Sequence, residues 1–173
     1  MNEEVKELIS FHGTSRKNAK LIKEDGFRMS PAGWLGEGIY FFHNNSDLAR
    51  KWANKNFSNQ RTEVIKRNIK VGNGKIFDMV NPEGEHNQLF HNLRADLVKQ
   101  SEANGIKCNF NREDLEEKIR KIESQVIKKI CENGDFHIVR AATFTKFFSI
   151  NECSVTPNGV EICVKRESYV NMR

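Results

Sequence analysis

Short apolar runs, several of them alternating with polar residues, predict six strands along the chain. They cover residues 5–12, 39–42, 63–71, 75–80, 136–144 and 160–164. The tripeptide Gly72-Asn73-Gly74 stands between the third and fourth runs and predicts a strand, a tight turn and a strand. A second turn signal, Pro157-Asn158-Gly159, comes directly before the last run.

Two short helices are predicted in the first third of the chain. Ser15 is a good N-cap for the first helix, and Gly26 is a good C-cap. Ser46 and Asp47 open the second helix. Its apolar residues form one stripe, which consists of Leu48, Ala49, Trp52, Ala53 and Phe57.

Two longer helices are predicted in the second half, over residues 88–99 and 112–133. The second has the clearest helical period, with Asn111 as its cap and Gly134 at its end. The apolar residues expected on one face are Leu89, Phe90, Leu93 and Leu97 in the first, and Leu115, Ile119, Ile122, Val126 and Ile130 in the second. Strands and helices follow one another without a regular βαβ alternation, which favours an α+β fold over a doubly wound sheet.

The composition is typical of a soluble globular protein and adds few constraints. Hydrophobic residues make up 38%, charged residues 29%, and the mean hydropathy is -0.65. We find no internal repeat and no low-complexity tract, so residues 1–173 are expected to form one domain. No apolar run is long enough to span a bilayer, and the acidic N-terminus is unlike a secretory signal, so a cytoplasmic protein is expected.

The cysteines and histidines lack the spacing of a metal or redox site. No cysteine pair has a two-to-four-residue spacing, so buried thiols in a reducing compartment are expected. No histidine pair has a two-His metal spacing, so no metal is expected. The residues concerned are Cys108, Cys131, Cys153, Cys163, His12, His43, His86, His91 and His137.

A glycine-rich segment over residues 33–38 suggests a phosphate loop but does not fit one. A Walker loop needs Gly-Lys-Ser/Thr at the start of a helix, and the dinucleotide fingerprint needs a preceding strand and a following helix. Here the glycines precede a strand. They indicate either a tight bend or a close approach of the backbone to a flat group.

Two short sequence motifs, taken together, point to a type of reaction. Phe11-His12-Gly13-Thr14 ends the first predicted strand, and about 20 residues later comes Gly36-Glu37-Gly38-Ile39-Tyr40-Phe41. With Glu161 opening a late strand, this order resembles the ADP-ribosyltransferase superfamily. The similar branch includes poly(ADP-ribose) polymerases and diphtheria toxin, and it carries a His, a Tyr and a Glu on three strands. The resemblance implies a split, mixed or antiparallel sheet with peripheral helices.

The resemblance also implies a reaction and roles for individual residues. NAD is the substrate and is cleaved at the nicotinamide glycosidic bond. The residues implied to bind it are His12, Gly13, Thr14, Gly38 and Tyr40. His12 bonds the adenosine ribose, the Gly13 backbone holds the carboxamide, and Tyr40 stacks on nicotinamide. Glu161 completes the catalytic set of His12, Tyr40 and Glu161, because it stabilises the developing positive charge.

Several differences from the family pattern narrow down the reaction product that we expect. Gly159 disfavours the arginine-targeting branch, which has a Glu-x-Glu pair there. Lys51 stands where polymerase-type members place a second aromatic residue, with Trp52 one position later. Leu48 stands where such enzymes often have a serine that contacts the carboxamide. We therefore expect transfer of a single ADP-ribose rather than chain elongation.

The acceptor is expected to be a macromolecule, either protein or nucleic acid. The net charge is +5, and residues 46–75 carry eight positive and two negative side chains. This basic window follows the Tyr40 motif and is therefore a candidate acceptor surface. Its candidate acceptor-binding residues are Arg50, Lys51, Lys55, Arg61, Lys66 and Arg67.

Other hypotheses stay open at this point. The architecture suggests a toxin or defence factor with a possible antitoxin partner. One alternative is an enzyme like the RNA 2′-phosphotransferases, which also consume NAD. Another alternative is a catalytically silent module that binds NAD or nucleic acid.

Overall fold

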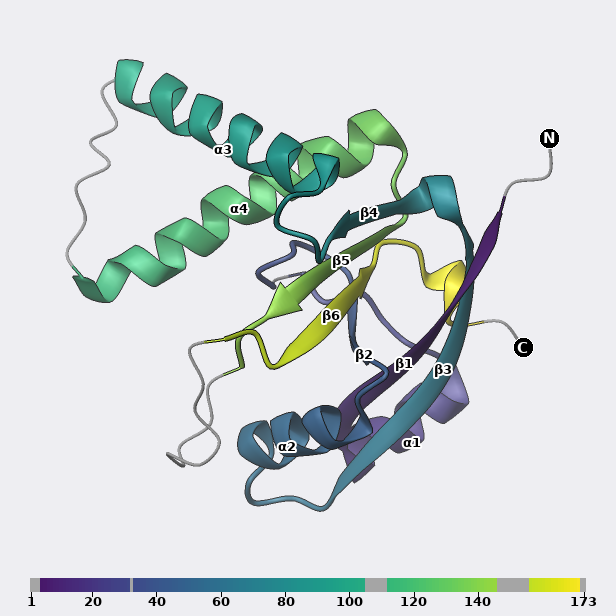
Figure 1. Cartoon of the computed structure of the whole chain (residues 1–173). Helices are drawn as coiled ribbons and strands as arrows, with labels where there is room; N and C mark the ends of the chain where they lie inside the picture. The colour runs from purple at the N-terminus through teal and green to yellow at the C-terminus, as the bar shows by residue number, and fades with distance from the viewer. Residues whose placement is uncertain (1–3, 32, 105–111, 146–155, 172–173) are drawn as a thin grey trace.

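The computed structural model describes residues 4–31, 33–104, 112–145 and 156–171 (Figure 1). Within these residues the fold is α+β, as predicted, with a six-stranded mixed sheet. The strands are β1 (Val5–Ser15), β2 (Ile39–His43), β3 (Thr62–Gly72), β4 (Ile76–Met79), β5 (Ile138–Thr143) and β6 (Gly159–Val164). The helices are α1 (Arg16–Asp25), α2 (Ser46–Asn56), α3 (Glu85–Ala103) and α4 (Arg112–Gly134).

The sheet order is β3-β1-β2-β6-β5-β4. β4 and β5 pair in parallel, whereas the other neighbours pair antiparallel. β1 pairs with β3 over the whole range from Val5↔Gly72 to Ser15↔Thr62. By contrast, β1 and β2 share only the pairs Ser10↔His43 and Phe11↔Phe42. The sheet therefore consists of two parts that are joined by a short ladder and diverge beyond Phe11.

The strand, tight turn and strand predicted around Gly72-Asn73-Gly74 are confirmed, but the two strands do not pair with each other. The chain passes through the short 3-10 turn η1 (Asn73–Lys75) from β3 into β4 (Figure 1). These two strands lie at opposite edges of the sheet. Each has its partner elsewhere, β3 on β1 and β4 on β5. A local turn signal contains no information about which distant strand completes a ladder.

The predicted caps of the two short helices are largely confirmed. The Ser15 hydroxyl accepts a hydrogen bond from the Asn18 amide at 3.2 Å, and Gly26 ends α1 with φ 90°. α2 begins at Ser46 as predicted, but its cap is Asn45, whose side chain accepts from the Leu48 amide at 2.8 Å. Strand β1 also continues to Ser15, three residues beyond its predicted end.

α1 and α2 cover opposite faces of the sheet. Ala19 of α1 belongs to the same buried cluster as Phe41, whereas Leu48 and Ala49 of α2 pack with Phe42. Consecutive residues of a strand point to opposite faces, so the two helices lie on either side of β2.

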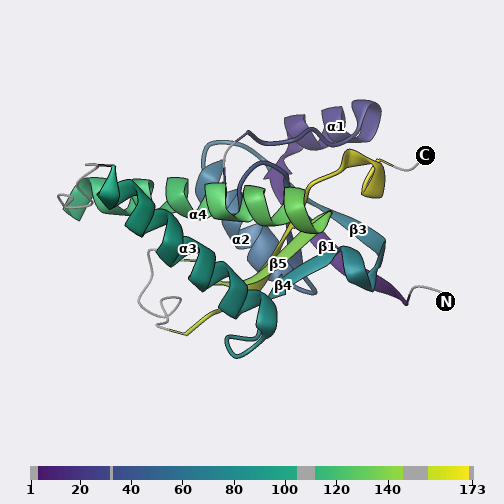
Figure 2. The same cartoon turned by 90° about the horizontal axis from the view of Figure 1, so that it is seen from above.

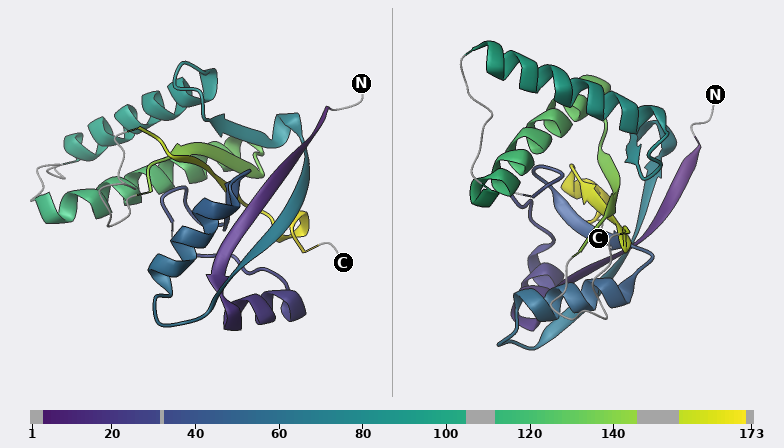
Figure 3. Two further views of the ribbon diagram at one scale, coloured as in Figure 1. Left: turned by 60° about the horizontal axis from the view of Figure 1, so that its bottom comes forward. Right: turned by 60° about the vertical axis from the view of Figure 1, so that its left-hand side comes forward.

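The long helices α3 and α4 lie together at one end of the molecule (Figure 2). The inner half of α4 is buried through Val126, Ile127 and Ile130, which pack with Phe77 and Val139 of the sheet. Both helices extend beyond the sheet (Figure 3). The predicted stripes are partly wrong, because three apolar side chains expected to be buried are exposed, namely Leu89, Leu93 and Leu115. On α3 the neighbouring Phe90 is the side chain that packs into the core. Asn111, the expected cap of α4, lies outside the described residues.

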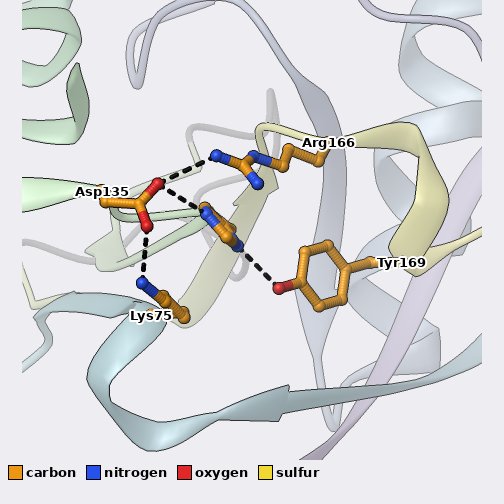
Figure 4. A network of polar contacts seen from close by, with 5 residues as sticks. Lys75, Asp135, Arg166 and Tyr169 are labelled. Atoms are coloured by element: carbon orange, nitrogen blue, oxygen red, sulfur yellow. Dashed lines mark hydrogen bonds and ion pairs between the residues drawn. The ribbon is translucent and has the colours of Figure 1, made fainter.

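A polar network ties the start of β5 to the C-terminal turn η3 (Glu167–Tyr169) (Figure 4). The Asp135 carboxylate accepts from Lys75 at 2.6 Å, and from His137 and Arg166 at 2.9 Å each. The other ring nitrogen of His137 bonds the Tyr169 hydroxyl at 2.7 Å. The hydrogen bonds from Lys75 and His137 lower the pKa of Asp135 to about 2. The carboxylate therefore stays ionised, and its contribution to stability is lost only as the pH falls towards that value.

None of the helices in the described part of the chain is long and apolar enough to cross a membrane.

Candidate active site

A cleft of about 1330 Å³ collects the residues implied by the sequence to bind NAD. It is lined by all five of them, His12, Gly13, Thr14, Gly38 and Tyr40, and by the expected catalytic residue Glu161. A second, smaller groove of about 910 Å³ lies across the residue 33–38 loop and shares Gly33 and Trp34 with the cleft. Residues of β1, β2 and β6 thus line one cleft, although they are up to 149 positions apart in the sequence.

The strand registers place Tyr40 and Glu161 on one face of the sheet and His12 on the other, where it packs on Phe41. His12 follows directly after the last β1–β2 pair, Phe11↔Phe42, where the two strands begin to diverge. Between β2 and β6, Tyr40 pairs with Cys163 and Phe42 with Glu161, which puts Tyr40 and Glu161 on the same face of the sheet. The cleft lies where β1 and β2 separate, so it admits side chains from both parts of the sheet.

His12 is fixed in one tautomer by its surroundings. Its Nδ1 lies 2.8 Å from the backbone oxygen of Tyr40. A carbonyl oxygen only accepts hydrogen bonds, so Nδ1 carries the proton and donates. Burial lowers the pKa of His12 and outweighs the opposite effect of this hydrogen bond. The imidazole is therefore neutral near pH 7, and its Nε2 is the nitrogen that can accept a hydrogen bond from a ligand.

The lowered pKa of His12 predicts a pH dependence of stability. In the unfolded chain a histidine binds a proton near pH 6.5, whereas the folded protein resists protonation of His12. The unfolded state therefore binds more protons below pH 6.5, and stability falls as the pH drops through that value. We expect a lower Tm at pH 5.5 than at pH 7.5, and a smaller difference in His12→Asn. Thermal unfolding measured by circular dichroism at the two pH values checks this.

Two further histidines provide the controls for that measurement. Burial also lowers the pKa of His43, so part of the pH dependence should persist in His12→Asn. His91 is exposed on α3, and His91→Asn is the matched control. An equal loss of pH dependence in His12→Asn and His91→Asn would contradict the assignment to His12.

The hydroxyl of Tyr40 is held by the glycine-rich loop. It donates to the Gly36 oxygen at 2.5 Å and accepts from the Leu35 amide at 3.0 Å. Burial raises the pKa of Tyr40, so the phenol stays protonated. A Cβ on Gly33 would lie 2.1 Å from the Tyr40 oxygen, so a larger residue at this position would displace the Tyr40 ring. The flat group that the loop approaches is thus a side chain of the protein itself.

Both carboxylate oxygens of Glu161 accept a hydrogen bond. The Thr143 hydroxyl donates to Oε1 at 2.7 Å, and the Trp34 indole N–H donates to Oε2 at 2.8 Å. The sequence reasoning singled out neither donor as a functional residue. Thr143 lies on β5, next to Glu161's own strand, and Trp34 lies in the glycine-rich loop 127 positions from Glu161. In the sequence, Trp34 is a single tryptophan among glycines. It belongs to no periodic pattern from which a role could be predicted.

Gly13 is required by helix packing. A Cβ at this position would lie 1.9 Å from the backbone oxygen of Ala49 in α2. On the same helix Leu48 is buried against Phe42, so it has a structural role. Trp52 is half-buried, packs edge to face on Phe57 and lines the cleft, whereas Lys51 is exposed. The aromatic residue that α2 provides to the cleft is therefore Trp52.

The basic window does not form one surface at the cleft. Of its six candidate residues, Lys55 lines the cleft. Arg67 is directed inward, since its Nε donates to the Val170 oxygen at 3.3 Å and its guanidinium lies 5.3 Å from the centre of the Phe27 ring. The other four are exposed, namely Arg50, Lys51, Arg61 and Lys66. Two cleft cations lie outside the window, Arg28 and Arg120.

The cysteines differ in burial. Cys163 is buried and Cys131 is half-buried, and neither is in a disulfide. Burial raises the pKa of the Cys131 thiol to about 11. Cys108 and Cys153 lie outside the described residues. Within the described part of the chain, no group of three or more His, Cys, Asp or Glu side chains could hold a metal ion.

The cleft thus combines a neutral histidine, a tyrosine and a carboxylate held by two donors. Comparison of the chain with models of protein families, with curated proteins and with solved structures finds no match. The function of the chain must therefore be inferred from the chemistry of the cleft.

Proposed function

We propose that this protein is an NAD-dependent mono-ADP-ribosyltransferase that modifies a macromolecule. The observation that supports the proposal most directly is that His12, Tyr40 and Glu161 line a single cleft. They do so in the chain order implied by the two sequence strings and the late strand. The proposal also assigns NAD as the substrate and requires no metal.

In the proposed reaction, the glycosidic bond to nicotinamide breaks and its electron pair leaves with nicotinamide. The ribose carbon then passes through an oxocarbenium-like state and forms a bond to a nucleophile of the acceptor, which loses a proton. The Glu161 carboxylate faces this positive charge and binds a ribose hydroxyl. The neutral His12 can accept a hydrogen bond through Nε2 from the other ribose, and the ring of Tyr40 can stack on nicotinamide.

The test of this proposal is release of nicotinamide from NAD labelled in the nicotinamide ring. Nicotinamide should appear in the presence of this chain, and label in the ADP-ribose part should transfer to RNA, DNA or protein. Binding of NAD without release would instead favour a catalytically silent module. Transfer of a phosphate from RNA to NAD would favour a reaction like that of the RNA 2′-phosphotransferases.

We propose nucleic acid and protein as the two acceptor classes, in a protein that acts as a toxin or defence factor. Nucleic acid is supported by Lys55 in the cleft and by Arg50 and Lys51 on the same helix. Positive side chains near a cleft attract a phosphate backbone. Inducing the wild type and Glu161→Gln in cells tests the toxin proposal, since only the wild type should arrest growth. An antitoxin partner would relieve this arrest when it is expressed together with the protein.

The charge on α2 predicts a salt dependence of transfer to nucleic acid. We expect transfer to an RNA or DNA acceptor to fall steeply between 50 and 200 mM salt, because each phosphate contact releases counterions. NAD hydrolysis without an acceptor should change little. Lys55→Glu should weaken transfer and lower the salt slope by about 1. The measurement is the initial rate of label transfer and of nicotinamide release across a salt series.

The control for this prediction is Lys20→Glu on α1, at a residue that is not among those lining the cleft. Lys20 is exposed and pairs with Glu24, as is typical of a solvated helix surface. Equal salt dependence of transfer and hydrolysis would contradict a nucleic-acid acceptor and favour protein.

A further inference from the structure

We infer that Trp34 and Thr143 are positioning residues that hold the Glu161 carboxylate in its reactive orientation. This inference rests on the proposed function. Each donor binds a different carboxylate oxygen, Thr143 at 2.7 Å and Trp34 at 2.8 Å. Together they fix both the position of the carboxylate and its rotation about the last side-chain bond.

Thr143 provides the first fixed point from the neighbouring strand. β5 and β6 pair antiparallel, with Ala141 opposite Glu161 and Thr143 opposite Gly159. Thr143 and Glu161 therefore lie on one face as diagonal neighbours. The Thr143 side chain is 6% exposed, so few alternative rotamers are open to its hydroxyl.

Trp34 provides the second fixed point from a loop that is held at several places. The Lys165 ammonium donates to the Leu35 oxygen at 2.6 Å and to the Glu37 oxygen at 2.7 Å. Tyr40 binds the same loop through its hydroxyl, and Leu35 is fully buried. The indole N–H of Trp34 is thus presented by a braced segment.

The base of this loop is closed as well. Ser30 and Gly38 exchange two backbone hydrogen bonds, at 2.9 and 3.0 Å. The bracing groups come from β2 and from Lys165, which directly follows β6. The strands that carry Tyr40 and Glu161 therefore also hold the loop that orients Glu161.

With both donors bound, the Glu161 carboxylate can still accept hydrogen bonds from a substrate. An ionised carboxylate has about four lone-pair sites, so two of them stay available for a ribose hydroxyl. Hydrogen bonds to a charged group are roughly twice as strong as those between neutral groups. A carboxylate fixed before substrate binds does not need to be ordered during the reaction.

The test compares kcat and KM for nicotinamide release in two variants that each remove one donor. Trp34→Phe keeps an aromatic ring but loses the N–H, and Thr143→Val keeps the shape but loses the hydroxyl. We expect kcat to fall about 10-fold to 100-fold in each variant, with KM changed by less than about 3-fold. Thr143→Ser, which keeps the hydroxyl, should restore most of kcat.

The matched control is Thr62→Val, which removes a hydroxyl bonded to Asn54 outside the cleft. It should leave kcat unchanged. A Tm within a few degrees of the wild type shows that each variant is folded. If Trp34→Phe does not fold, the Thr143 pair of variants still decides the inference.

A double-mutant comparison separates positioning from a general structural role. In a Glu161→Gln background, the residual rate should fall no further when Trp34→Phe or Thr143→Val is added. An equal fold-loss in both backgrounds would overturn the inference, as would unchanged kcat in the single variants. Equal release by the wild type and Glu161→Gln would instead overturn the proposed function, and the inference with it.

Discussion

Glu161→Gln is expected to reduce nicotinamide release from NAD by a factor of about 10² to 10³. The substitution preserves the size of the side chain and leaves an oxygen that can accept from Thr143 or Trp34. It removes the negative charge that stabilises the oxocarbenium-like state. Because that charge matters most in the transition state, kcat should fall while NAD affinity changes little. Single-turnover release of labelled nicotinamide and calorimetric titration with NAD measure the two effects.

Glu167→Gln is the matched control for this prediction. Glu167 lies near the same end of the chain, but its carboxylate accepts from the Met29 amide and is not among the residues that line the cleft. Release by Glu167→Gln should equal that of the wild type. Loss of release in Glu167→Gln with retention in Glu161→Gln would contradict the assignment of Glu161.

Gly13→Ala is expected to destabilise the fold itself. A methyl group at this position would approach the Ala49 oxygen to 1.9 Å, so the backbone of β1 or α2 must move. Overpacking of this kind costs about 1–3 kcal/mol and sometimes more. For a chain of this length the Tm should fall by about 2–12 °C. Differential scanning calorimetry with and without NAD measures the shift.

Gly74→Ala controls for the general effect of replacing a glycine. Gly74 is exposed in the η1 turn, and its φ is not positive, so alanine should be tolerated there. If Gly13→Ala instead kept the wild-type Tm and lost NAD binding, Gly13 would be needed for the ligand and not for packing.

The secondary structure was readable from the sequence because its signals are local. The caps Ser15 and Gly26 and the period of α4 depend on residues within a few positions of one another. The buried face of α3 was misjudged at Leu89 and Leu93, because a helical period shows which residues share a face but not whether another element covers it.

Only part of the candidate site could be predicted from the sequence. His12, Tyr40 and Glu161 were chosen from short strings and their order, and the structure brings them to one cleft. Trp34 and Thr143 carry no comparable string. Their importance follows from hydrogen bonds to Glu161 that span 127 and 18 positions of the chain.

The sequence by itself determined the elements, the α+β class and a set of candidate residues, since each depends on local spacing and side-chain type. Only the tertiary structure decided that β3 and β4 lie at opposite edges of the sheet. It also decided that Arg67 is directed inward and that the close packing of α2 leaves room only for glycine at position 13. The two hydrogen bonds to Glu161, from Trp34 and Thr143, likewise follow only from the tertiary structure. The physical reason is the same in each case. Strand pairing, close packing and cross-chain hydrogen bonds depend on which distant segments meet, and local sequence spacing does not contain that information.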